Sequence, residues 1–205
     1  MMEKKEHWEN VFSTKLEHEV SWFQSHPKTS MDFIANLNIS KEAKIIDIGG
    51  GDSYFIDFLL EAGFTNLYLL DISEQAVIRI KNRLGSKSKN VTFIVSDVLD
   101  FKTDIVFDFW HDRASFHFLT NKKEVDKYAE IVSNSLAIGG NLVIGTFSEE
   151  GPKKCSGLDI TQYNIKTLPL VFAKHFALID CSTEDHDTPF GTKQNFIFCS
   201  FIKTK

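Results

Sequence analysis

The sequence predicts an α/β fold in which helices cover both faces of a mostly parallel sheet and the last strand along the chain runs antiparallel. From residue 44 to residue 147, short apolar runs of strand length alternate with longer segments whose apolar residues follow the helical period. Such alternation requires right-handed crossovers between parallel strands. After residue 173, two strand-like runs follow each other without a helix between them, which favours an antiparallel pair.

The first 40 residues are rich in polar and aromatic side chains, and we expect them to form helices that lie ahead of the main fold. The four prolines and 11 glycines are scattered, and the sequence contains neither a low-complexity linker nor an internal repeat. We therefore expect a single domain over residues 1–205, with a helical cover at 1–40 and an α/β core at 41–205.

Three strands and two helices are expected in the first part of this core. Gly63 closes the first helix, because glycine suits a helix C-terminus, and Ser73 begins the second, because its hydroxyl can cap the first turn. The strands are expected at Lys44–Ile48, Asn66–Leu70 and Val91–Val95, and the helices at Tyr54–Ala62 and Ser73–Leu84.

The second part of the core is expected to contain a long amphipathic helix and four strands. The helix Lys122–Leu136 ends near Gly139. A further helix at Ile165–Ala173 is expected to be broken at Pro169. The strands are expected at Ile105–Trp110, Asn141–Phe147, Phe176–Ser182 and Asn195–Ile202, of which the last two form the antiparallel pair.

The composition is that of an ordinary globular protein, since 42% of the 205 residues are hydrophobic and 25% are charged. The net charge of −5 argues against a large basic surface, so we expect no nucleic-acid partner. No apolar run approaches the ~18 residues of a membrane span, and residues 1–6 lack the apolar core of a signal peptide. We expect a protein of the reducing cytoplasm without a membrane partner.

The three cysteines, Cys155, Cys181 and Cys199, are odd in number and show no CxxC spacing. We therefore expect neither a disulfide framework nor a zinc site, and no other metal is expected.

A glycine-rich bend, Gly49–Gly51, lies between the first predicted strand and the first predicted helix. Glycines suit a bend that a ligand approaches closely, and the N-terminus of the following helix attracts an anionic group. Asp47, Asp71 and Asp97 end three successive predicted strands, whose carboxyl ends meet at one edge of the sheet. Asp71 is expected where a carboxylate can accept hydrogen bonds from two ribose hydroxyls. The alternative is a tight structural turn beside acids that only cap helices.

The bend differs from two other nucleotide-binding motifs. The dinucleotide fingerprint GxGxxG fails, because its sixth position is Tyr54 when counted from Gly49 and Phe55 when counted from Gly50. A Walker loop is excluded as well, since no Gly-Lys-Ser/Thr follows the bend.

The series IIDIGGGDS, LLDIS, SDV, FDFWHD and LAIGGNLVI resembles the ordered motifs of class I S-adenosylmethionine-dependent methyltransferases. It runs from Ile45 to Ile144, and QNFIFCSFI at Gln194–Ile202 resembles the reversed last strand of that family. The resemblance implies a Rossmann-like, doubly wound sheet of the class I methyltransferase fold. It also implies the cofactor S-adenosyl-L-methionine and the product S-adenosyl-L-homocysteine.

The same resemblance implies which residues contact the cofactor. The acid and the glycines of the first motif would surround the methionine part, the second motif would hold the ribose and adenine, and the third would bind the adenine edge. In chain order these residues are Asp47, Gly49, Gly50, Gly51, Asp71, Ile72, Asp97 and Val98. Ser53 departs from the family pattern, which often has a third glycine there.

The segment His7–Pro27 resembles the N-terminal segment of some small-molecule and some protein-lysine methyltransferases, where it helps to cover the cofactor. The resemblance places Trp22 and Phe23 near the methionine end. Alternatively, a hydrophobic staple formed by these residues holds the N-terminal helix to the sheet.

On the acceptor side, His111 is the candidate for a general base or for a group that orients the acceptor. The alternative is an ordinary polar loop with an Asp112–Arg113 ion pair. Methyl transfer needs no protein nucleophile, so none is assigned to Cys155. The sequence lacks Asn/Asp-Pro-Pro-Tyr/Phe, which is typical of enzymes that modify amide or exocyclic amino nitrogens. We expect a small-molecule acceptor; the alternatives are a protein lysine and a non-catalytic cofactor-binding partner subunit.

Overall fold

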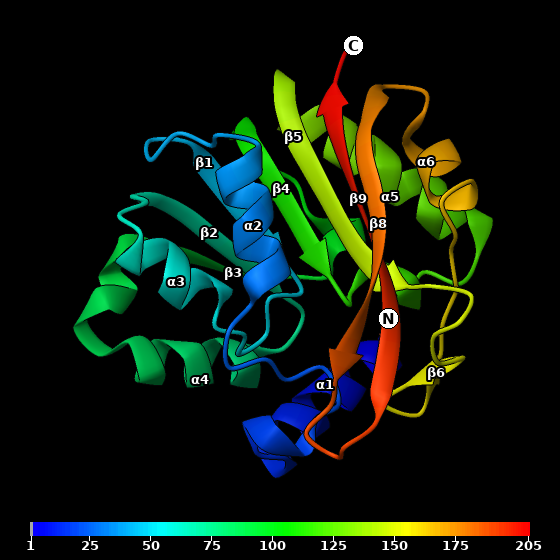
Figure 1. Cartoon of the computed structure of the whole chain (residues 1–205). Helices are drawn as coiled ribbons and strands as arrows, with labels where there is room; N and C mark the ends of the chain where they lie inside the picture. The colour runs from blue at the N-terminus through cyan, green and yellow to red at the C-terminus, as the bar shows by residue number, and fades with distance from the viewer. Residues whose placement is uncertain (1) are drawn as a thin grey trace.

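The computed structural model describes residues 2–205 as a seven-stranded sheet with helices on both faces (Figure 1). The strand order is β3-β2-β1-β4-β5-β9-β8. The strands β1 to β5 run parallel, whereas β9 is antiparallel to both of its neighbours, β5 and β8. The seven strands are β1 (Lys44–Ile48), β2 (Asn66–Asp71), β3 (Val91–Val95), β4 (Phe107–Arg113), β5 (Leu136–Phe147), β8 (Phe176–Asp187) and β9 (Lys193–Lys203). The predicted fold class, mostly parallel with an antiparallel last strand, is confirmed.

Helices α2, α3 and α4 cover one face of the sheet, and α5 and α6 cover the other (Figure 1). Helix α1 lies across the carboxyl ends of the parallel strands. The six α-helices are α1 (Met2–Thr14), α2 (Lys28–Asn36), α3 (Phe55–Glu61), α4 (Glu74–Leu84), α5 (Lys122–Ser135) and α6 (Thr167–Phe172). Short 3-10 turns span Glu17–Glu19 (η1), Gly85–Asn90 (η2), Val98–Asp100 (η3) and Phe116–Phe118 (η4), and a two-stranded ribbon is formed by β6 (Lys154–Cys155) and β7 (Leu158–Asp159). None of the helices within residues 2–205 is long and apolar enough to cross a membrane.

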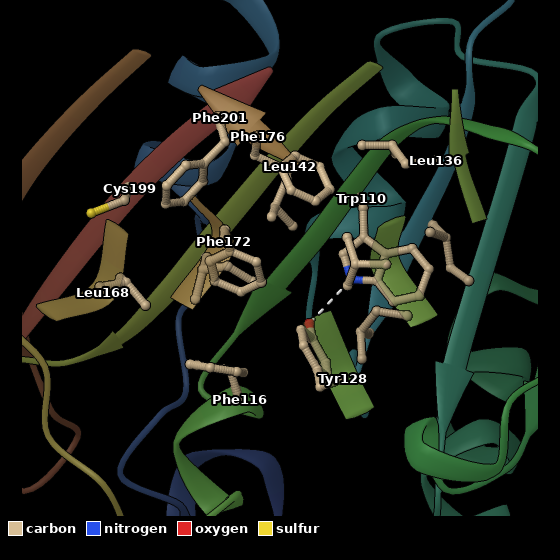
Figure 2. Packing of buried hydrophobic residues seen from close by; sticks show 14 of the residues in the cluster. Trp110, Phe116, Tyr128, Leu136, Leu142, Leu168, Phe172, Phe176, Cys199 and Phe201 are labelled. Carbon is tan, nitrogen blue, oxygen red and sulfur yellow. Dashed lines mark hydrogen bonds between the residues drawn. The ribbon is translucent and has the colours of Figure 1, made fainter. Parts of the chain in front are cut away.

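Aromatic side chains fill the core beneath α5 and α6 (Figure 2). The indole N–H of Trp110 on β4 donates to the hydroxyl of Tyr128 on α5 at 3.1 Å, so this buried donor is satisfied. The ring of Phe116 packs at 5.0 Å from that of Tyr128 and at 5.7 Å from that of Phe172 on α6. Much of the large phenylalanine content therefore serves packing.

The expected elements in the first part of the core are confirmed to within one residue at each strand end. The hydroxyl of Ser73 caps α4 by accepting a hydrogen bond from the N–H of Ala76 at 3.2 Å. Gly63 follows α3 with φ +86°, the left-handed conformation that favours glycine after a helix.

Four expectations in the second part of the core are wrong. β8 continues to Asp187, beyond the expected end at Ser182, because residues 183–187 still pair with β9. β4 starts at Phe107 and continues to Arg113, because its last residues still pair with β1 and β5 on both sides. β5 starts at Leu136, which the sequence assigned to the preceding helix. Helix α6 is not broken, because Pro169 is its third residue, in the first turn, where an N–H has no acceptor within the helix.

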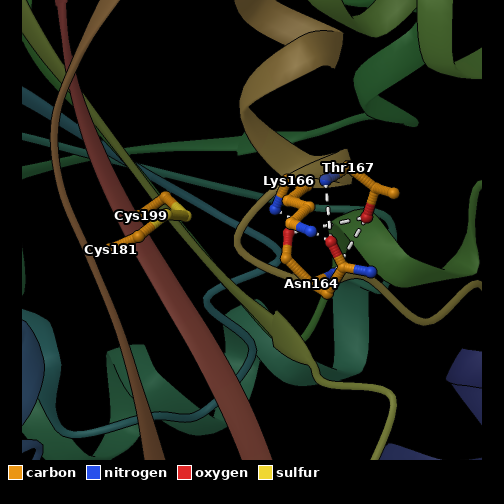
Figure 3. The surroundings of a disulfide bond; sticks show 5 residues. All are labelled: Asn164, Lys166, Thr167, Cys181 and Cys199. Atoms are coloured by element: carbon orange, nitrogen blue, oxygen red, sulfur yellow. Dashed lines mark hydrogen bonds between the residues drawn. A yellow bond between two sulfur atoms is a disulfide. The ribbon is translucent and has the colours of Figure 1, made fainter.

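The expectation of no disulfide is also wrong for one pair. The structure joins Cys181 on β8 to Cys199 on β9 (Figure 3). The two residues are direct partners in the antiparallel register of these strands. The spacing of the cysteines does not reveal this pairing, because it depends on the register of the hairpin. Cys155 is free and buried.

Candidate active site

A pocket lies at the carboxyl edge of the sheet, enclosed by the ends of β1, β2, β3 and β4 and by the N-terminal segment. Each residue that the sequence assigned to the site lines it: Trp22, Asp47, Gly49, Gly50, Gly51, Asp71, Ile72, Asp97, Val98 and His111. The acids that end three successive strands therefore face one cavity. No group of His, Cys, Asp and Glu that could hold a metal ion is found in the described part of the chain.

The bend after β1 leaves space for backbone only. Gly49 and Gly51 have φ values of +59° and +54°, which side chains rarely allow. A Cβ atom on Gly50 would lie 2.5 Å from Oδ2 of Asp47, and one on Gly51 would lie 2.9 Å from Cζ of Phe12. The three glycines are thus required both by the backbone conformation and by the close approach of neighbouring groups.

The carboxylate of Asp71 is held by the backbone on both sides. Its Oδ2 accepts from the N–H of Gly51 and its Oδ1 from the N–H of Ser73, each at 2.8 Å. Burial raises the pKa of Asp71 to about 7; the two N–H groups lower it, whereas the charges of Asp47 and Asp52 raise it further. Each oxygen retains a lone pair, so the carboxylate can still accept hydrogen bonds from a ligand in the pocket.

Asp47 and His111 are neighbours on β1 and β4 and form one hydrogen-bonded pair. Nδ1 of His111 lies 2.7 Å from Oδ1 of Asp47, and Nε2 lies 2.9 Å from Oγ of Ser30 on α2. Both ring nitrogens are therefore engaged. In contrast, Oδ2 of Asp47 is buried and has no partner among residues 2–205. The bond from His111 fixes this carboxylate with one free oxygen at the glycine bend.

Asp97 lies at the end of β3, where it begins η3. Its Oδ1 accepts from the N–H of Leu99 at 2.9 Å, which orients the carboxylate beside the pocket. Ile72 and Val98 add apolar lining close to the acids that end β2 and β3. This part of the pocket combines a hydrogen-bonding acid with apolar walls.

Glu9 on α1 is a contact that sequence reasoning missed. Its Oε1 accepts from the N–H of Glu74 at 2.8 Å, and its Oε2 accepts from the N–H of Gln75 at 3.0 Å and from the hydroxyl of Ser73 at 2.9 Å. Although burial raises the pKa of Glu9, these hydrogen bonds lower it below its usual value. The carboxylate thus caps α4 from outside the helix and attaches α1 to the rim of the pocket.

Arg83 on α4 is a second contact that sequence reasoning missed. Its guanidinium donates to the carboxylate of Asp57 at 2.8 and 3.1 Å and to the carbonyl oxygen of Ser53 at 2.6 Å. It also donates to the carbonyl oxygen of Asp52 and lies over the ring of Tyr54 at 4.1 Å. One side chain on α4 therefore holds the end of the glycine bend and the start of α3.

Aromatic side chains of the N-terminal segment form one wall of the pocket. The ring of Trp8 on α1 lies 5.7 Å from that of Trp22 and 5.1 Å from that of Phe118. Phe23 also lines the pocket, so both aromatic residues that were expected near the methionine end face it. These rings give the cavity an apolar wall.

The expected Asp112–Arg113 ion pair is wrong, because successive residues of a strand point to opposite faces. Asp112 faces α5, where its Oδ2 accepts from the hydroxyl of Tyr128 at 2.7 Å. Burial raises the pKa of Asp112 to about 6. Arg113 lies on the other face and lines the pocket. Burial also raises the pKa of the Cys155 thiol to about 12, so this lining residue is a thiol and not a nucleophilic thiolate.

The order of the seven strands, with a glycine bend after β1 and acids after β2 and β3, defines the class I methyltransferase fold. A family model described as "Methyltransferase domain" matches residues 39–185. The chain belongs to this family, the class I S-adenosylmethionine-dependent methyltransferases.

Two similar relatives differ in the acceptor that their names specify. Malonyl-[acyl-carrier protein] O-methyltransferase 2 of Ilyobacter polytropus is 29% identical over 107 residues, which are 52% of this chain and 40% of that protein. The eEF1A lysine and N-terminal methyltransferase of Mus musculus is 24% identical over 166 residues, covering 71% of this chain and 24% of that protein. The chain therefore spans less than half the length of either relative.

Solved structures resemble the whole chain at low identity. The structure described as "Conversion of a Disulfide Bond into a Thioacetal Group during Echinomycin Biosynthesis" has a TM-score of 0.80 and 16% identity, and the match covers 98% of this chain and 93% of that one. N-methyltransferase NodS from Bradyrhizobium japonicum WM9, in complex with S-adenosyl-L-homocysteine, has a TM-score of 0.72 and 14% identity, with coverage of 96% and 98%. These likenesses support the fold.

Proposed function

We propose that this chain transfers a methyl group from S-adenosyl-L-methionine to a small molecule. One observation carries the proposal: a single pocket is lined both by the glycine bend, which has no side chains, and by the acids at the ends of β1, β2 and β3. The unpaired Oδ2 of buried Asp47 supports the fit, because a buried carboxylate oxygen requires a donor.

The proposed contacts between the cofactor and the pocket run from β1 to β2 to β3. Oδ2 of Asp47 and the bend Gly49–Gly51 would hold the methionine part, with Oδ2 accepting a hydrogen bond from its ammonium group. Asp71, whose oxygens are already oriented by two backbone N–H groups, would accept hydrogen bonds from the ribose hydroxyls. Asp97 would accept a hydrogen bond from the adenine amino group, and Ile72 and Val98 would supply apolar contacts to the ring.

We propose that His111 positions Asp47 instead of acting as a base on the acceptor. Its two nitrogens are engaged by Asp47 and Ser30, at 2.7 and 2.9 Å, which supports this role. His111→Gln is expected to weaken S-adenosyl-L-homocysteine binding, whereas loss of a base would lower kcat and leave that affinity unchanged.

The bound sulfonium supplies an electrophilic methyl group. The protein then has to exclude water and hold the acceptor in line, which can contribute ~7–11 kcal/mol in favourable cases. The aromatic wall of Trp8, Trp22 and Phe118 suits water exclusion. A general base is required only when the acceptor atom carries a proton.

Calorimetry with S-adenosyl-L-methionine tests the cofactor site. Wild-type protein is expected to bind, and Asp71→Ala is expected to bind at least about tenfold more weakly, because both ribose hydrogen bonds lose their acceptor. Equal affinity of the two proteins would refute the assignment of Asp71.

A labelled-methyl assay on cell extract tests the acceptor class. Label in the small-molecule fraction is expected. Label in the macromolecular fraction would favour the second candidate, a protein-lysine methyltransferase, for which the relative from Mus musculus is the supporting observation. Label in neither fraction, despite cofactor binding, would favour a non-catalytic partner subunit.

A further inference from the structure

Arg113 is a cation whose hydrogen-bonding capacity is largely unused. It ends β4 on the same face of the sheet as His111 and lines the pocket. Its Nη1 donates to the carbonyl oxygen of Trp22 at 3.0 Å, and its guanidinium carbon lies 4.9 Å from the ring centroid of Phe196. Its Nε and Nη2 are buried and have no partner among the residues that the structure describes.

Without a ligand this arrangement destabilises the folded protein, because the buried N–H groups of a charged side chain lose their hydrogen bonds to water and form none in their place. Burial lowers the pKa of Arg113 to about 10, so the group remains charged at neutral pH. The carboxylates of Glu184 and Asp47 are near enough to favour its charge, but neither forms an ion pair with it. Each has a closer partner, Thr29 and His111 respectively.

The other side chains around Arg113 are apolar or neutral. Cys155 is a protonated thiol, and Trp22 and Phe118 present aromatic surface to the same pocket. The imidazole of His117 is buried and has a pKa near 3, because of burial and of the nearby guanidinium, so it is neutral. Lys4 also lines the pocket, but its ammonium group is paired with the carboxylate of Glu124 at 3.2 Å. Among the described residues, the unpartnered N–H groups of Arg113 are therefore the cationic donors that remain for an anion in this pocket.

We infer that Arg113 binds a carboxylate of the methyl acceptor, and that the acceptor is a small molecule with a flat, apolar body. A guanidinium has two adjacent N–H groups whose spacing matches the two oxygens of a carboxylate. The aromatic wall of the pocket suits a flat, apolar acceptor. The inference rests on the proposed function and narrows it, because a protein lysine would bring an ammonium group next to this cation.

The test uses three probes of one shape, benzoate, benzamide and benzylamine, on protein saturated with S-adenosyl-L-homocysteine. Binding of that product is measured first, so a failure of the proposed function is seen before any probe is added. Benzoate is then expected to bind at least about tenfold more tightly than the neutral amide, and benzylamine more weakly than either.

Arg113→Gln is expected to weaken benzoate binding about tenfold and to leave benzamide binding unchanged. Arg113→Lys keeps the positive charge but cannot donate two parallel hydrogen bonds to a carboxylate, so its loss of benzoate affinity is expected to be intermediate. This variant also tests the inference if Arg113→Gln does not fold. Lys193→Gln removes one positive charge from the start of β9, outside the pocket, and is expected to change nothing.

Three outcomes would overturn the inference. One is equal binding, or no binding, of benzoate and benzamide to the wild-type protein loaded with product. Another is unchanged benzoate affinity in both folded Arg113 variants. The third is tighter binding of benzylamine than of benzoate, which would favour a cationic acceptor.

Discussion

Gly50 is the residue at which a single methyl group should separate cofactor binding from folding. The added Cβ of Gly50→Ala would lie 2.5 Å from Oδ2 of Asp47, the oxygen proposed to bind the methionine part. We expect affinity for S-adenosyl-L-homocysteine to fall by about tenfold or more, as measured by calorimetry. Gly63→Ala is the control, because the added Cβ has no atom within 4 Å, although the backbone φ of +86° is unfavourable for alanine. It should lower stability by about 1 kcal/mol and leave affinity unchanged; a similar loss of affinity in both variants would contradict the assignment.

Asp71 should make product binding dependent on pH. Its pKa of about 7 in the folded protein means that the carboxylate becomes fully charged only as the pH rises through neutrality. A charged acceptor binds ribose hydroxyls more strongly, so affinity for S-adenosyl-L-homocysteine should rise between about pH 6 and about pH 8. Asp71→Asn carries no titrating group there and should flatten the profile. A wild-type profile as flat as that of the variant would refute the role of the carboxylate.

At the scale of elements, Arg83 connects α4 to the glycine bend and to α3. Arg83→Met keeps most of the side-chain volume but removes the hydrogen bonds to Ser53 and Asp57. The bend should then lose its fixed geometry, and cofactor affinity should fall by about 1–2 kcal/mol, which would raise KM for the cofactor more than it lowers kcat. If kcat falls while KM for the cofactor is unchanged, the hydrogen bonds of Arg83 do not act through cofactor binding.

Glu9 connects α1 to the N-terminus of α4. Glu9→Gln removes the negative charge from three hydrogen bonds at that helix end, so we expect a loss of about 1 kcal/mol in the free energy of unfolding. The pKa of Glu9 is lowered in the folded state, so its contribution is present at neutral pH and is lost as the pH falls through its ordinary range near pH 4. Glu6→Gln, an exposed acid on the same helix, is the control for urea denaturation and should be neutral.

The elements that the sequence predicted well are those whose signal is local. Strand β1 has an apolar run, and α4 has a serine cap, so short windows suffice for both. The strand end at His111–Arg113 was missed, because polar residues enter a strand only when neighbours on both sides pair with them. Likewise, the role of Arg83 was missed because its partners belong to other segments of the chain. The pairing of Cys181 with Cys199 was missed because it depends on the register of a hairpin.

Across the whole molecule, β4 divides its side chains between two functions. Its residues on the α2–α4 face, His111 and Arg113, belong to the pocket. Its residues on the α5 face, Trp110 and Asp112, belong to the core (Figure 2). Alternation along one strand thus places the candidate chemistry and a buried polar network on opposite faces of that strand. Tyr128, which bonds to both Trp110 and Asp112, also lines the pocket, so damage to this network should lower stability and disturb the pocket wall as well.

Tyr128→Phe tests how much this network contributes to stability. The hydroxyl of Tyr128 accepts from the indole of Trp110 and donates to Asp112, so its removal leaves a buried donor and a buried carboxylate oxygen unpaired. We expect the free energy of unfolding, measured by urea denaturation at neutral pH, to fall by about 2–4 kcal/mol.

This loss should depend on pH through Asp112. Burial raises the pKa of Asp112 to about 6, so its carboxyl group binds a proton more tightly in the folded than in the unfolded state. The stability that this proton confers is lost as the pH rises from about 4 to about 6. Without its hydroxyl partner the pKa should rise further, and the gap between variant and wild type should widen from about pH 5 to about pH 7. Tyr163→Phe removes the hydroxyl of a mostly buried tyrosine on the same face, for which no hydrogen bond is found among residues 2–205, and should cost little at either pH. An equal loss in both variants would mean that aromatic packing, and not the network, stabilises this face.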